Sequence, residues 1–389
     1  MAGPQKAKYR VGIIGGGRMG THHARAYALN PMTKVVAVAD QDPENLELFC
    51  HRFNVPGSGS YEDMFANEQI DIAAPVLPVR ANADAVVAAA QAGVKAVFCE
   101  KPLTGSLEDA DRMVESCHAR GILFAAGLIP RNYPEYWKAR KIIESGEIGE
   151  VQSINIYDKN DQGGCHGINM ARMFARDADV DWVVGWVEGN PFSDYEAGHS
   201  DSTEGFKGIG GYIRFCNGLE CFSHVRAGVR SRVSESGRGL EVVCSRGVLF
   251  NDSRGLHLLK EREAAEPGKL GELKEVKGLF EDTRNPGERP YDTEGWRLPT
   301  PGMMASVQAL VNALENGTAP KLSTGDDLRK ALELCIAMRE SHRQNHCPVK
   351  LPLTDRSLKM YPVNARWNYK KEVYGREQYM AEMARYTKT

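Results

Sequence analysis

The segment that most constrains the fold lies near the start of the chain, where a short apolar run leads into closely spaced glycines. Residues 9–14 read Tyr-Arg-Val-Gly-Ile-Ile, and Gly15, Gly17 and Gly20 follow in the spacing G-x-G-x-x-G before a helix-compatible stretch at 21–29. A strand, this spacing and a helix together are typical of a dinucleotide-binding unit. Gly15 allows the tight turn, Gly17 lets a pyrophosphate approach the backbone, and Gly20 lets helix and strand pack closely, while the helix N-terminus holds the phosphate charge.

A carboxylate at the end of the next apolar run supports this interpretation. Residues 34–39 (KVVAVA) predict a second strand, and Asp40 follows it, 20 residues beyond Gly20. A carboxylate at that place accepts hydrogen bonds from an adenosine ribose and repels a 2′-phosphate, so NAD is expected rather than NADP. Arg18 and Met19, inside the loop, are expected to contact the cofactor as well. The alternative is that the glycines form an ordinary strand-to-helix turn and that Asp40 caps the strand.

Strand and helix patterns then alternate along the first third of the chain. Strands are predicted at 70–77, 96–99 and 123–126, and helices at 83–92 and 108–120. Such alternation predicts an α/β fold with a doubly wound parallel sheet. In that architecture ligands lie beyond the carboxyl ends of the strands, so the segments that follow each strand are expected to face the site.

Composition excludes several classes of protein and partner. The 389 residues carry 49 Lys and Arg against 51 Asp and Glu, so no strong field attracts nucleic acid or anionic lipid. No stretch reaches the roughly 18 apolar residues of a membrane span, and residues 1–8 lack the apolar core of a secretory signal. The nine cysteines are scattered without a C-x-x-C pair. We expect a cytoplasmic protein with reduced thiols, no structural zinc, and neither a nucleic-acid nor a membrane partner.

A second motif makes the pattern specific to one family. Glu100-Lys101-Pro102 follows the predicted strand 96–99, and together with GIIGGGRMGTHHARAY at the front it resembles the glucose-fructose oxidoreductase, inositol dehydrogenase and rhizopine-catabolism family, Gfo/Idh/MocA. Residues 306–353 resemble the helix pair and strand that close that family's fold. The resemblance implies an N-terminal Rossmann domain followed by an α/β domain with a large, mainly antiparallel sheet that covers the nicotinamide.

The second half of the sequence independently fits such a sheet. Strand patterns occur at 151–157, 209–216, 219–225, 240–244 and 256–260, with Asn217-Gly218 as a strong hairpin turn. We therefore predict a Rossmann domain at 1–128 and a substrate and oligomerisation domain at 129–354. The tail at 355–389, rich in aromatic and charged residues, is expected to pack on the core or on a neighbouring subunit.

Lys101 is the first candidate for the chemistry that the resemblance implies. Moving a hydride from a carbinol carbon to a nicotinamide requires a base near the hydroxyl oxygen. In similar proteins the lysine of E-K-P binds the reacting hydroxyl, and its bond to proline is cis, which fixes the direction of the side chain. Glu100 is expected beside the cofactor. Without the resemblance, Lys101 reads as a surface lysine in a strand-to-helix loop.

His166 is the second candidate. Family members generally carry D-x-G-x-H with a polar residue three positions on, which His166 and Asn169 match, whereas Gln162 stands at the aspartate position and Asp161 is displaced by one residue. A neutral amide hydrogen-bonds a sugar hydroxyl but takes no proton, so the base is expected to be Lys101 or His166. Whether Asp161 replaces the missing carboxylate stays open, as does a purely structural role for His166.

Weaker matches complete the predicted site. Pro78 and Asn82 stand where similar proteins often have T-P-N-H-x-H, and we expect both to contact the cofactor. Arg131 and Tyr133 resemble the family's R-[FY]-x-P segment and are assigned to the substrate, with packing between domains as the alternative. His342 and His346 have a zinc-compatible spacing, but we read them as exposed cations at a helix end and expect no metal.

The sequence is compatible with three functions. The leading hypothesis is an NAD-dependent dehydrogenase that acts on a secondary hydroxyl of a sugar, cyclitol or glycoside. The second is a redox-assisted glycosidase that works through a transient 3-keto intermediate and keeps its cofactor. The third is a non-catalytic dinucleotide-binding sensor or regulatory subunit. A homodimer or homotetramer is expected from the resemblance alone.

Overall fold

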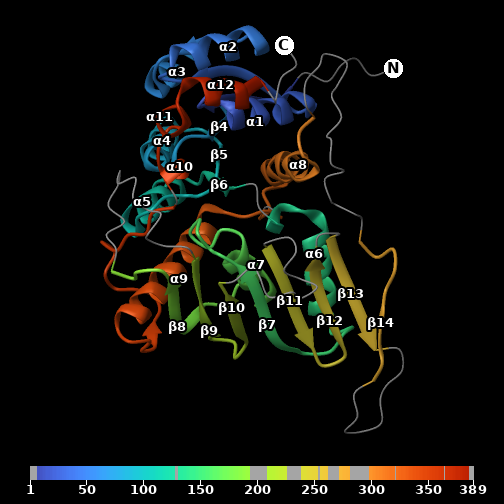
Figure 1. The fold of residues 1–389 in the computed structure, drawn as a ribbon. Coiled ribbons are helices and arrows are strands. Elements are labelled where there is room, and N and C mark those ends of the chain that lie inside the picture. Colours follow the sequence, from blue (N-terminus) through green and yellow to red (C-terminus); the bar gives the residue numbers. More distant parts are fainter. Residues whose placement is uncertain are drawn as a thin grey trace, which may run out of the picture. The chain divides into compact units, whose positions relative to one another are not determined.

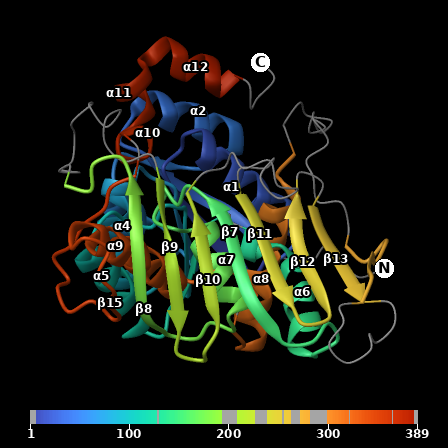
Figure 2. The same cartoon turned by 60° about the horizontal axis from the view of Figure 1, so that its bottom comes forward.

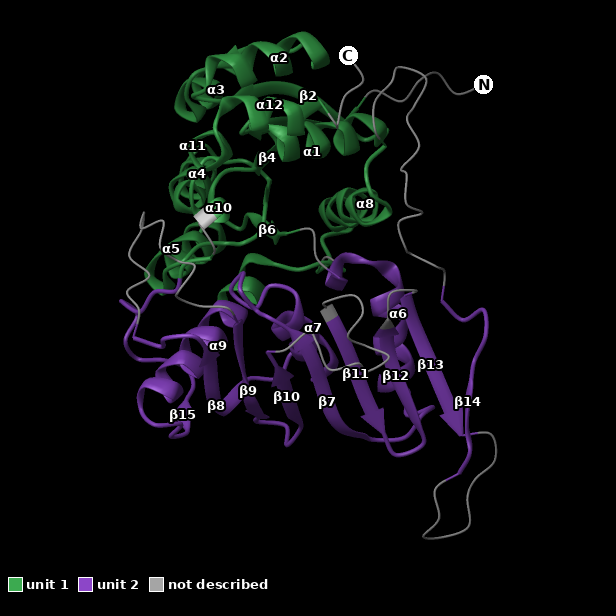
Figure 3. Ribbon diagram, viewed as in Figure 1, with its two compact units in different colours: residues 1–128, 285–329, 361–389 green, residues 129–284, 330–360 purple. Residues whose placement is uncertain are grey.

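The computed structural model describes residues 7–127, 130–192, 208–225, 238–252, 255–261, 271–280, 298–319, 321–362 and 364–384. Figure 1 shows its helices and strands along the chain. The chain divides into two compact units: residues 1–128, 285–329 and 361–389 form the first, and residues 129–284 and 330–360 the second (Figure 3).

The first unit contains a six-stranded parallel sheet. Its strand order is β3-β2-β1-β4-β5-β6, the doubly wound order of a dinucleotide-binding fold, which confirms the predicted α/β class. The strands are β1 (Tyr9–Ile14), β2 (Thr33–Ala39), β3 (Gly57–Ser58), β4 (Ile72–Pro75), β5 (Ala96–Cys99) and β6 (Leu123–Ala126). Their side chains are almost entirely buried, as expected for a parallel sheet covered on both faces.

Helices connect these strands, and some of them begin at a residue whose side chain caps the helix N-terminus. The helices are α1 (Arg18–Leu29), α2 (Pro43–Phe53), α3 (Tyr61–Asn67), α4 (Val79–Gln91) and α5 (Leu107–His118). Asp42 accepts hydrogen bonds from the backbone N–H groups of Glu44 and Asn45 at the start of α2, and Ser106 caps α5 in the same way. The buried faces of α1 and α2 contribute Tyr27 and Phe49 to the core.

The expected single middle domain at 129–354 is divided in the structure, because residues 285–329 group with the first unit. The reason is the apolar face of helix α8 (Pro301–Asn316). Its side chains Met303, Val307 and Leu310 are completely buried in the same cluster as strands β1, β4 and β5. Thr300 caps this helix through the backbone N–H of Met303.

The second unit contains a nine-stranded mixed sheet, in which β7 and β10 pair in parallel and the other pairs are antiparallel. The predicted large, mainly antiparallel sheet is confirmed. Its order is β14-β13-β12-β11-β7-β10-β9-β8-β15. The bounds are β7 (Val151–Asp158), β8 (Val180–Glu188), β9 (Gly208–Phe215), β10 (Glu220–His224), β11 (Arg238–Cys244), β12 (Gly247–Asp252), β13 (Gly255–Glu261), β14 (Leu273–Glu275) and β15 (Val349–Lys350).

Helices cover one face of this sheet, and the opposite face is toward the viewer in Figure 2. Helix α7 (Gly167–Phe174) contacts β7 and β11, and Met338 of α9 (Gly325–Arg343) lies against Gly185 of β8. Helix α6 (Pro134–Glu144) follows the short 3-10 turn Pro130–Asn132. Burial alternates along β8 and β10, with Val183 and Cys221 buried while Trp186 and Phe222 are exposed, which is typical of a sheet covered on one face.

Of the two histidines expected to be exposed near the end of α9, only His342 differs from the expectation. His342 was expected as an exposed cation, but it is half-buried and its Nδ1 accepts a hydrogen bond from the backbone N–H of Val187 at 2.9 Å. Burial lowers the pKa of His342. His346, which is exposed, stacks on it. Among the residues that the structure describes, no group of three or more His, Cys, Asp or Glu side chains is placed to hold a metal ion.

The tail from residue 361 onward belongs to the first unit, so packing on the core is the expectation that the fold supports. It forms α10 (Asn364–Trp367), α11 (Lys370–Tyr374) and α12 (Arg376–Ala384). Tyr379 and Met383 are its buried side chains. None of the helices in the described part of the chain is long and apolar enough to span a lipid bilayer.

Candidate functional site

The glycine loop between β1 and α1 is built so tightly that side chains would not fit. Gly15 has φ +100°, and a Cβ there would lie 2.5 Å from the carbonyl oxygen of Val76. A Cβ on Gly20 would lie 1.8 Å from the carbonyl oxygen of Gly15. Gly17 precedes the first turn of α1, and no side chain caps that end. The first N–H groups of α1 can therefore hold an anion such as a pyrophosphate.

Asp40 is fixed beside this loop by backbone hydrogen bonds. The N–H of Gly16 donates to Oδ2 at 2.7 Å, and the N–H of Asp42 donates to Oδ1 at 2.8 Å. Burial raises the pKa of Asp40, although these two hydrogen bonds act in the opposite direction. The side chain of Asn45 hydrogen-bonds Asp40 as well. An ionised carboxylate has about four acceptor positions, so about one remains for a hydroxyl of a ribose.

A cavity of about 410 Å³ lies at the carboxyl ends of β1, β2, β4 and β5, within the size range of small-molecule sites. The alternation of strands and helices in the sequence predicted a ligand at this edge of the parallel sheet. The predicted cofactor residues that line the cavity are Gly15, Gly17, Arg18, Met19, Gly20, Asp40, Pro78, Glu100 and Lys101. The residues of this cavity all belong to the first unit.

Asn82 was expected to contact the cofactor, but it is not among the residues that line the cavity. It is buried in α4, and its amide nitrogen donates to the carbonyl oxygens of Pro102 and Leu103, both at 3.1 Å. The amide therefore holds the turn that follows Lys101. The Lys101–Pro102 bond is cis, as the resemblance implied.

Sequence reasoning did not identify the partner of His23. His23 on α1 is completely buried, and its Nε2 lies 3.2 Å from Oε2 of Glu100. The other carboxylate oxygen, Oε1, lies 3.9 Å from Nζ of Lys101. Although burial raises the pKa of Glu100, the hydrogen bond with His23 and the charge of Lys101 outweigh it, so the pKa is lowered. Glu100 thus presents a negative charge next to the candidate base. The sequence feature that could have indicated this contact is a histidine three residues after Gly20.

In the second unit, His166 directly precedes helix α7. It is 5% exposed and stands at the N-cap position. Asp158, at the end of β7, accepts a hydrogen bond from the N–H of Gly167 at 3.0 Å and another from the N–H of Asn160 at 3.1 Å. Asp158 therefore stabilises the start of α7, and sequence reasoning did not single it out. Asp161 and Gln162 are half-buried in the turn between Asn160 and His166.

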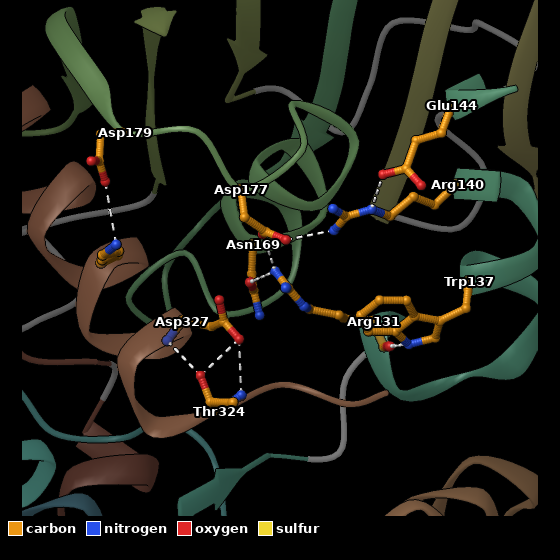
Figure 4. A network of polar contacts seen from close by, with 10 residues as sticks. Arg131, Trp137, Arg140, Glu144, Asn169, Asp177, Asp179, Thr324 and Asp327 are labelled. Carbon is orange, nitrogen blue, oxygen red and sulfur yellow. Dashed lines mark hydrogen bonds and ion pairs between the residues drawn. The ribbon is translucent and has the colours of Figure 1, made fainter. Parts of the chain in front are cut away.

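Arg131 and Asn169 are brought together in the second unit, as Figure 4 shows. Nη1 of Arg131 donates to Oδ1 of Asn169 at 3.2 Å and to Oδ1 of Asp177 at 2.7 Å. Arg140 donates to the other oxygen of Asp177, and the indole N–H of Trp137 donates to the carbonyl oxygen of Arg131. Burial raises the pKa of Asp177, but the two arginines outweigh it and hold that pKa below its ordinary value of 3.8.

This cluster gives Arg131 a structural task within its own unit. Its side chain is 6% exposed and orients Asn169, which is completely buried. Tyr133, two residues on, is half-buried at the start of α6. Of the residues predicted to bind substrate, Arg131 and Asn169 are therefore in direct contact, while Asp161, Gln162 and Tyr133 lie in the adjoining turns.

Comparison with known proteins agrees with the sequence resemblance. Residues 9–128 match the Gfo/Idh/MocA family, described as an oxidoreductase family with an NAD-binding Rossmann fold. That description agrees with the NAD expectation and with the geometry of the glycine loop. The match covers the parallel sheet of the first unit from β1 to the end of β6.

Curated relatives match over a similar segment. Levoglucosan dehydrogenase of Pseudarthrobacter phenanthrenivorans is 33% identical over 155 residues, which cover 37% of this chain and 39% of the relative. Inositol 2-dehydrogenase of Rhizobium meliloti is 30% identical over 151 residues, covering 39% and 45%. 2,7-Anhydro-N-acetylneuraminate hydratase of Escherichia coli is 32% identical over 144 residues, covering 37% and 38%. The chain thus spans less than half the length of each of these relatives.

Solved structures share the fold over most of the chain. An oxidoreductase from Agrobacterium radiobacter, solved in complex with NAD+, L-tartaric acid and magnesium, superimposes with a TM-score of 0.68 at 18% identity. The superposition covers 88% of this chain and 98% of that one. Levoglucosan dehydrogenase in complex with NADH and levoglucosan gives a TM-score of 0.65 at 19% identity, covering 89% and 100%.

Proposed function

Residues 9–128 belong to the Gfo/Idh/MocA oxidoreductase family, and from this we infer that the chain is an NAD-dependent oxidoreductase acting on a secondary hydroxyl of a sugar, cyclitol or glycoside. The observation that carries this proposal is one cavity lined by the glycine loop, by Asp40 and by Lys101. Relatives named as levoglucosan and inositol dehydrogenases support the substrate class.

The order of the strands sets the direction of the cofactor in this proposal. Asp40 follows β2 and Lys101 follows β5, and the strands between them run β2-β1-β4-β5. Three strand spacings of about 4.8 Å separate the two ends by about 14 Å. The adenosine ribose would bind Asp40, the pyrophosphate would lie on the N-terminus of α1, and the nicotinamide would lie toward Lys101.

The reaction requires the removal of one hydride and one proton from the substrate. When bound, NAD supplies the hydride acceptor, so that alcohol and NAD+ give ketone, NADH and a proton. We assign the proton of the hydroxyl to the amine of Lys101, which must be uncharged to accept it. The carboxylate of Glu100 lies 3.9 Å from that amine and is itself held by a contact with His23. Glu100 therefore positions Lys101, and Lys101 remains the proposed base.

The second unit is proposed to supply the substrate-binding groups. His166 is the alternative base, and Asn169, Gln162 and Asp161 are polar groups suited to sugar hydroxyls. Arg131 acts through Asn169, which it orients. Tyr133 stays a substrate-binding prediction, and assembly as a homodimer or homotetramer stays a prediction as well.

The second candidate function is a redox-assisted glycosidase that keeps its cofactor bound and regenerates it within each turnover. The observation that favours it is the hydratase name of two relatives, because adding water involves no net oxidation. In this version the substrate is oxidised transiently at C3, which acidifies the adjacent C–H, and the hydride returns after the elimination. A non-catalytic sensor, the third function considered, is disfavoured because Lys101 lines the cavity.

A substrate screen distinguishes these functions. Sugars, inositols and glycosides are incubated with the protein and NAD, the absorbance at 340 nm is followed, and products are identified by NMR. A dehydrogenase accumulates NADH and keto-sugar in equal amounts. Turnover without NADH indicates the recycling mechanism. Binding of NADH without turnover of any substrate in the screen would contradict both catalytic proposals and favour the sensor.

A further inference from the structure

The C-terminal segment 361–384 lines part of the dinucleotide cavity, a role that sequence reasoning did not assign to it. It belongs to the same compact unit as the glycine loop. The residues of this segment that line the cavity are Ala365, Arg366, Asn368, Tyr369, Lys370 and Tyr379. Three short helices therefore form one wall of the site that the proposed function assigns to NAD.

Tyr379 of α12 places its hydroxyl against the glycine loop. The side chain is buried, and its hydroxyl donates to Oδ1 of Asn45 at 3.1 Å. A Cβ on Gly17 would lie 2.9 Å from this hydroxyl oxygen. The phenol therefore stands beside the glycine that a pyrophosphate approaches. Burial raises the pKa of Tyr379, so its hydroxyl stays protonated, and its single O–H can turn from Asn45 to a phosphate oxygen when a dinucleotide binds.

Tyr369, between α10 and α11, also lines the cavity. Its ring lies near the end of β2, where its hydroxyl hydrogen-bonds the side chain of Gln41. The guanidinium of Arg80 lies 5.1 Å from the ring centre. An aromatic ring next to Asp40 offers a flat apolar surface on which an adenine base can pack.

Ion pairs link the segment to α2, beside its buried side chains Tyr379 and Met383. Lys371 lies 2.6 Å from Asp42 and 3.1 Å from Glu44, and Arg376 lies 2.6 Å from Glu44. The hydrogen bonds from Lys371 and Arg376 lower the pKa of Glu44. These pairs are partly exposed to solvent and are weakened by salt. Tyr379 and Met383 belong to neither of the buried apolar clusters of the parallel sheet, so the segment can detach without disrupting that core.

We propose that residues 361–384 complete the dinucleotide site and control exchange of the cofactor. The hydroxyl of Tyr379 donates to the pyrophosphate, the ring of Tyr369 packs on the adenine, and the dinucleotide leaves when the helices α10–α12 detach. This proposal rests on the proposed function of the cavity as an NAD site. Slow exchange limits a dehydrogenase that must release NADH at each turnover, but it suits an enzyme that recycles its cofactor in place.

The test is the dissociation rate of NADH, followed by its fluorescence when excess NAD+ displaces it. Combining Lys371→Glu with Arg376→Glu turns the attraction to Asp42 and Glu44 into repulsion, and we expect dissociation to become about tenfold faster. Tyr379→Phe removes only the hydroxyl, and we expect an increase of about threefold.

Two matched controls accompany these variants. Lys260→Glu reverses one charge of a surface ion pair with Glu147 in the second unit, at 2.9 Å. Tyr374→Phe removes the hydroxyl of an exposed tyrosine in α11 that does not line the cavity. Both controls are expected to dissociate NADH at the unmodified rate.

The outcomes separate this proposal from the proposed function. Unchanged dissociation rates in the test variants, with NADH still bound, would overturn the role of the segment and leave the dinucleotide site intact. Failure of the unmodified protein to bind NADH would overturn the proposed function itself. Hydrogen exchange of peptides within 364–384 provides a second measurement without any substitution: NADH is expected to slow their exchange, and unchanged exchange contradicts the proposal.

Discussion

The glycine loop of the first unit and the Arg131 cluster of the second unit position polar groups in different ways. In the loop, the chemistry comes from backbone N–H groups within a few residues, and glycine is required at positions 15 and 20 because a Cβ at either would overlap backbone atoms. In the cluster, Arg131 from the 3-10 turn and Arg140 from α6 meet at Asp177, in the turn after α7, and Arg131 also contacts Asn169 of α7. A site made of backbone is encoded in local spacing, whereas a site made of side chains depends on the fold that brings distant residues together.

Gly20→Ala is expected to have the largest effect, because it breaks the backbone site directly. The new Cβ would lie 1.8 Å from the carbonyl oxygen of Gly15. Relieving this overlap requires the backbone of the loop or of helix α1 to shift. We expect NADH binding to weaken about 100-fold or more and unfolding to become easier by about 3 kcal/mol. Fluorescence titration with NADH and thermal unfolding measure the two effects.

Gly93→Ala is the matched control for this substitution. Gly93 also has a positive φ, +75°, but nothing lies within 4 Å of the added Cβ. It is expected to cost about 1 kcal/mol of backbone strain and to leave NADH affinity unchanged. If Gly20→Ala bound NADH as tightly as Gly93→Ala, the assignment of the loop to the cofactor would be wrong.

Asp177→Asn tests the side-chain site and is expected to change stability without removing cofactor binding. The substitution leaves two arginines without their shared carboxylate, at a cost of about 2–4 kcal/mol at neutral pH. Because the pKa of Asp177 is lower in the folded than in the unfolded chain, its contribution is complete above the ordinary value of 3.8 and disappears as the pH falls through the folded value.

The difference in unfolding free energy between the unmodified protein and Asp177→Asn is therefore expected to stay constant near neutral pH and to shrink as the pH falls below the ordinary value of 3.8. Urea unfolding at several pH values measures it. Asp179→Asn is the control, since the side chain of Asp179 is 78% exposed and lies 3.3 Å from Lys330. A difference for Asp177→Asn that stays constant with pH would show that its carboxylate does not stabilise the cluster through its charge.

The same contrast explains what could be predicted from the sequence. The alternating pattern and the glycine spacing predicted the parallel sheet, the loop and the place of Asp40, because each depends on neighbours along the chain. The role of Asn82 in the turn after Lys101 and the partnership of His23 with Glu100 were not predictable, since each joins separate elements. The grouping of α8 with the first unit likewise depends on which apolar faces meet in space.

The tail shows the limit of composition as evidence. Its tyrosines and charges indicated packing, and both the core and a neighbouring subunit were compatible with that pattern. The ion pairs of Lys371 and Arg376 with Asp42 and Glu44 place it on the first unit. Nothing in the local sequence distinguishes Tyr379, which lines the cavity, from Tyr374, which does not.

The central claim is that Lys101 accepts the hydroxyl proton at a dinucleotide site. The most direct measurement is the single-turnover rate of NADH formation at 340 nm with Lys101→Met, using saturating NAD and the substrate found by the screen. Loss of a positioned base predicts a rate about 1000-fold lower with NADH affinity nearly unchanged. A rate equal to that of the unmodified protein, at equal NADH affinity, would contradict the account.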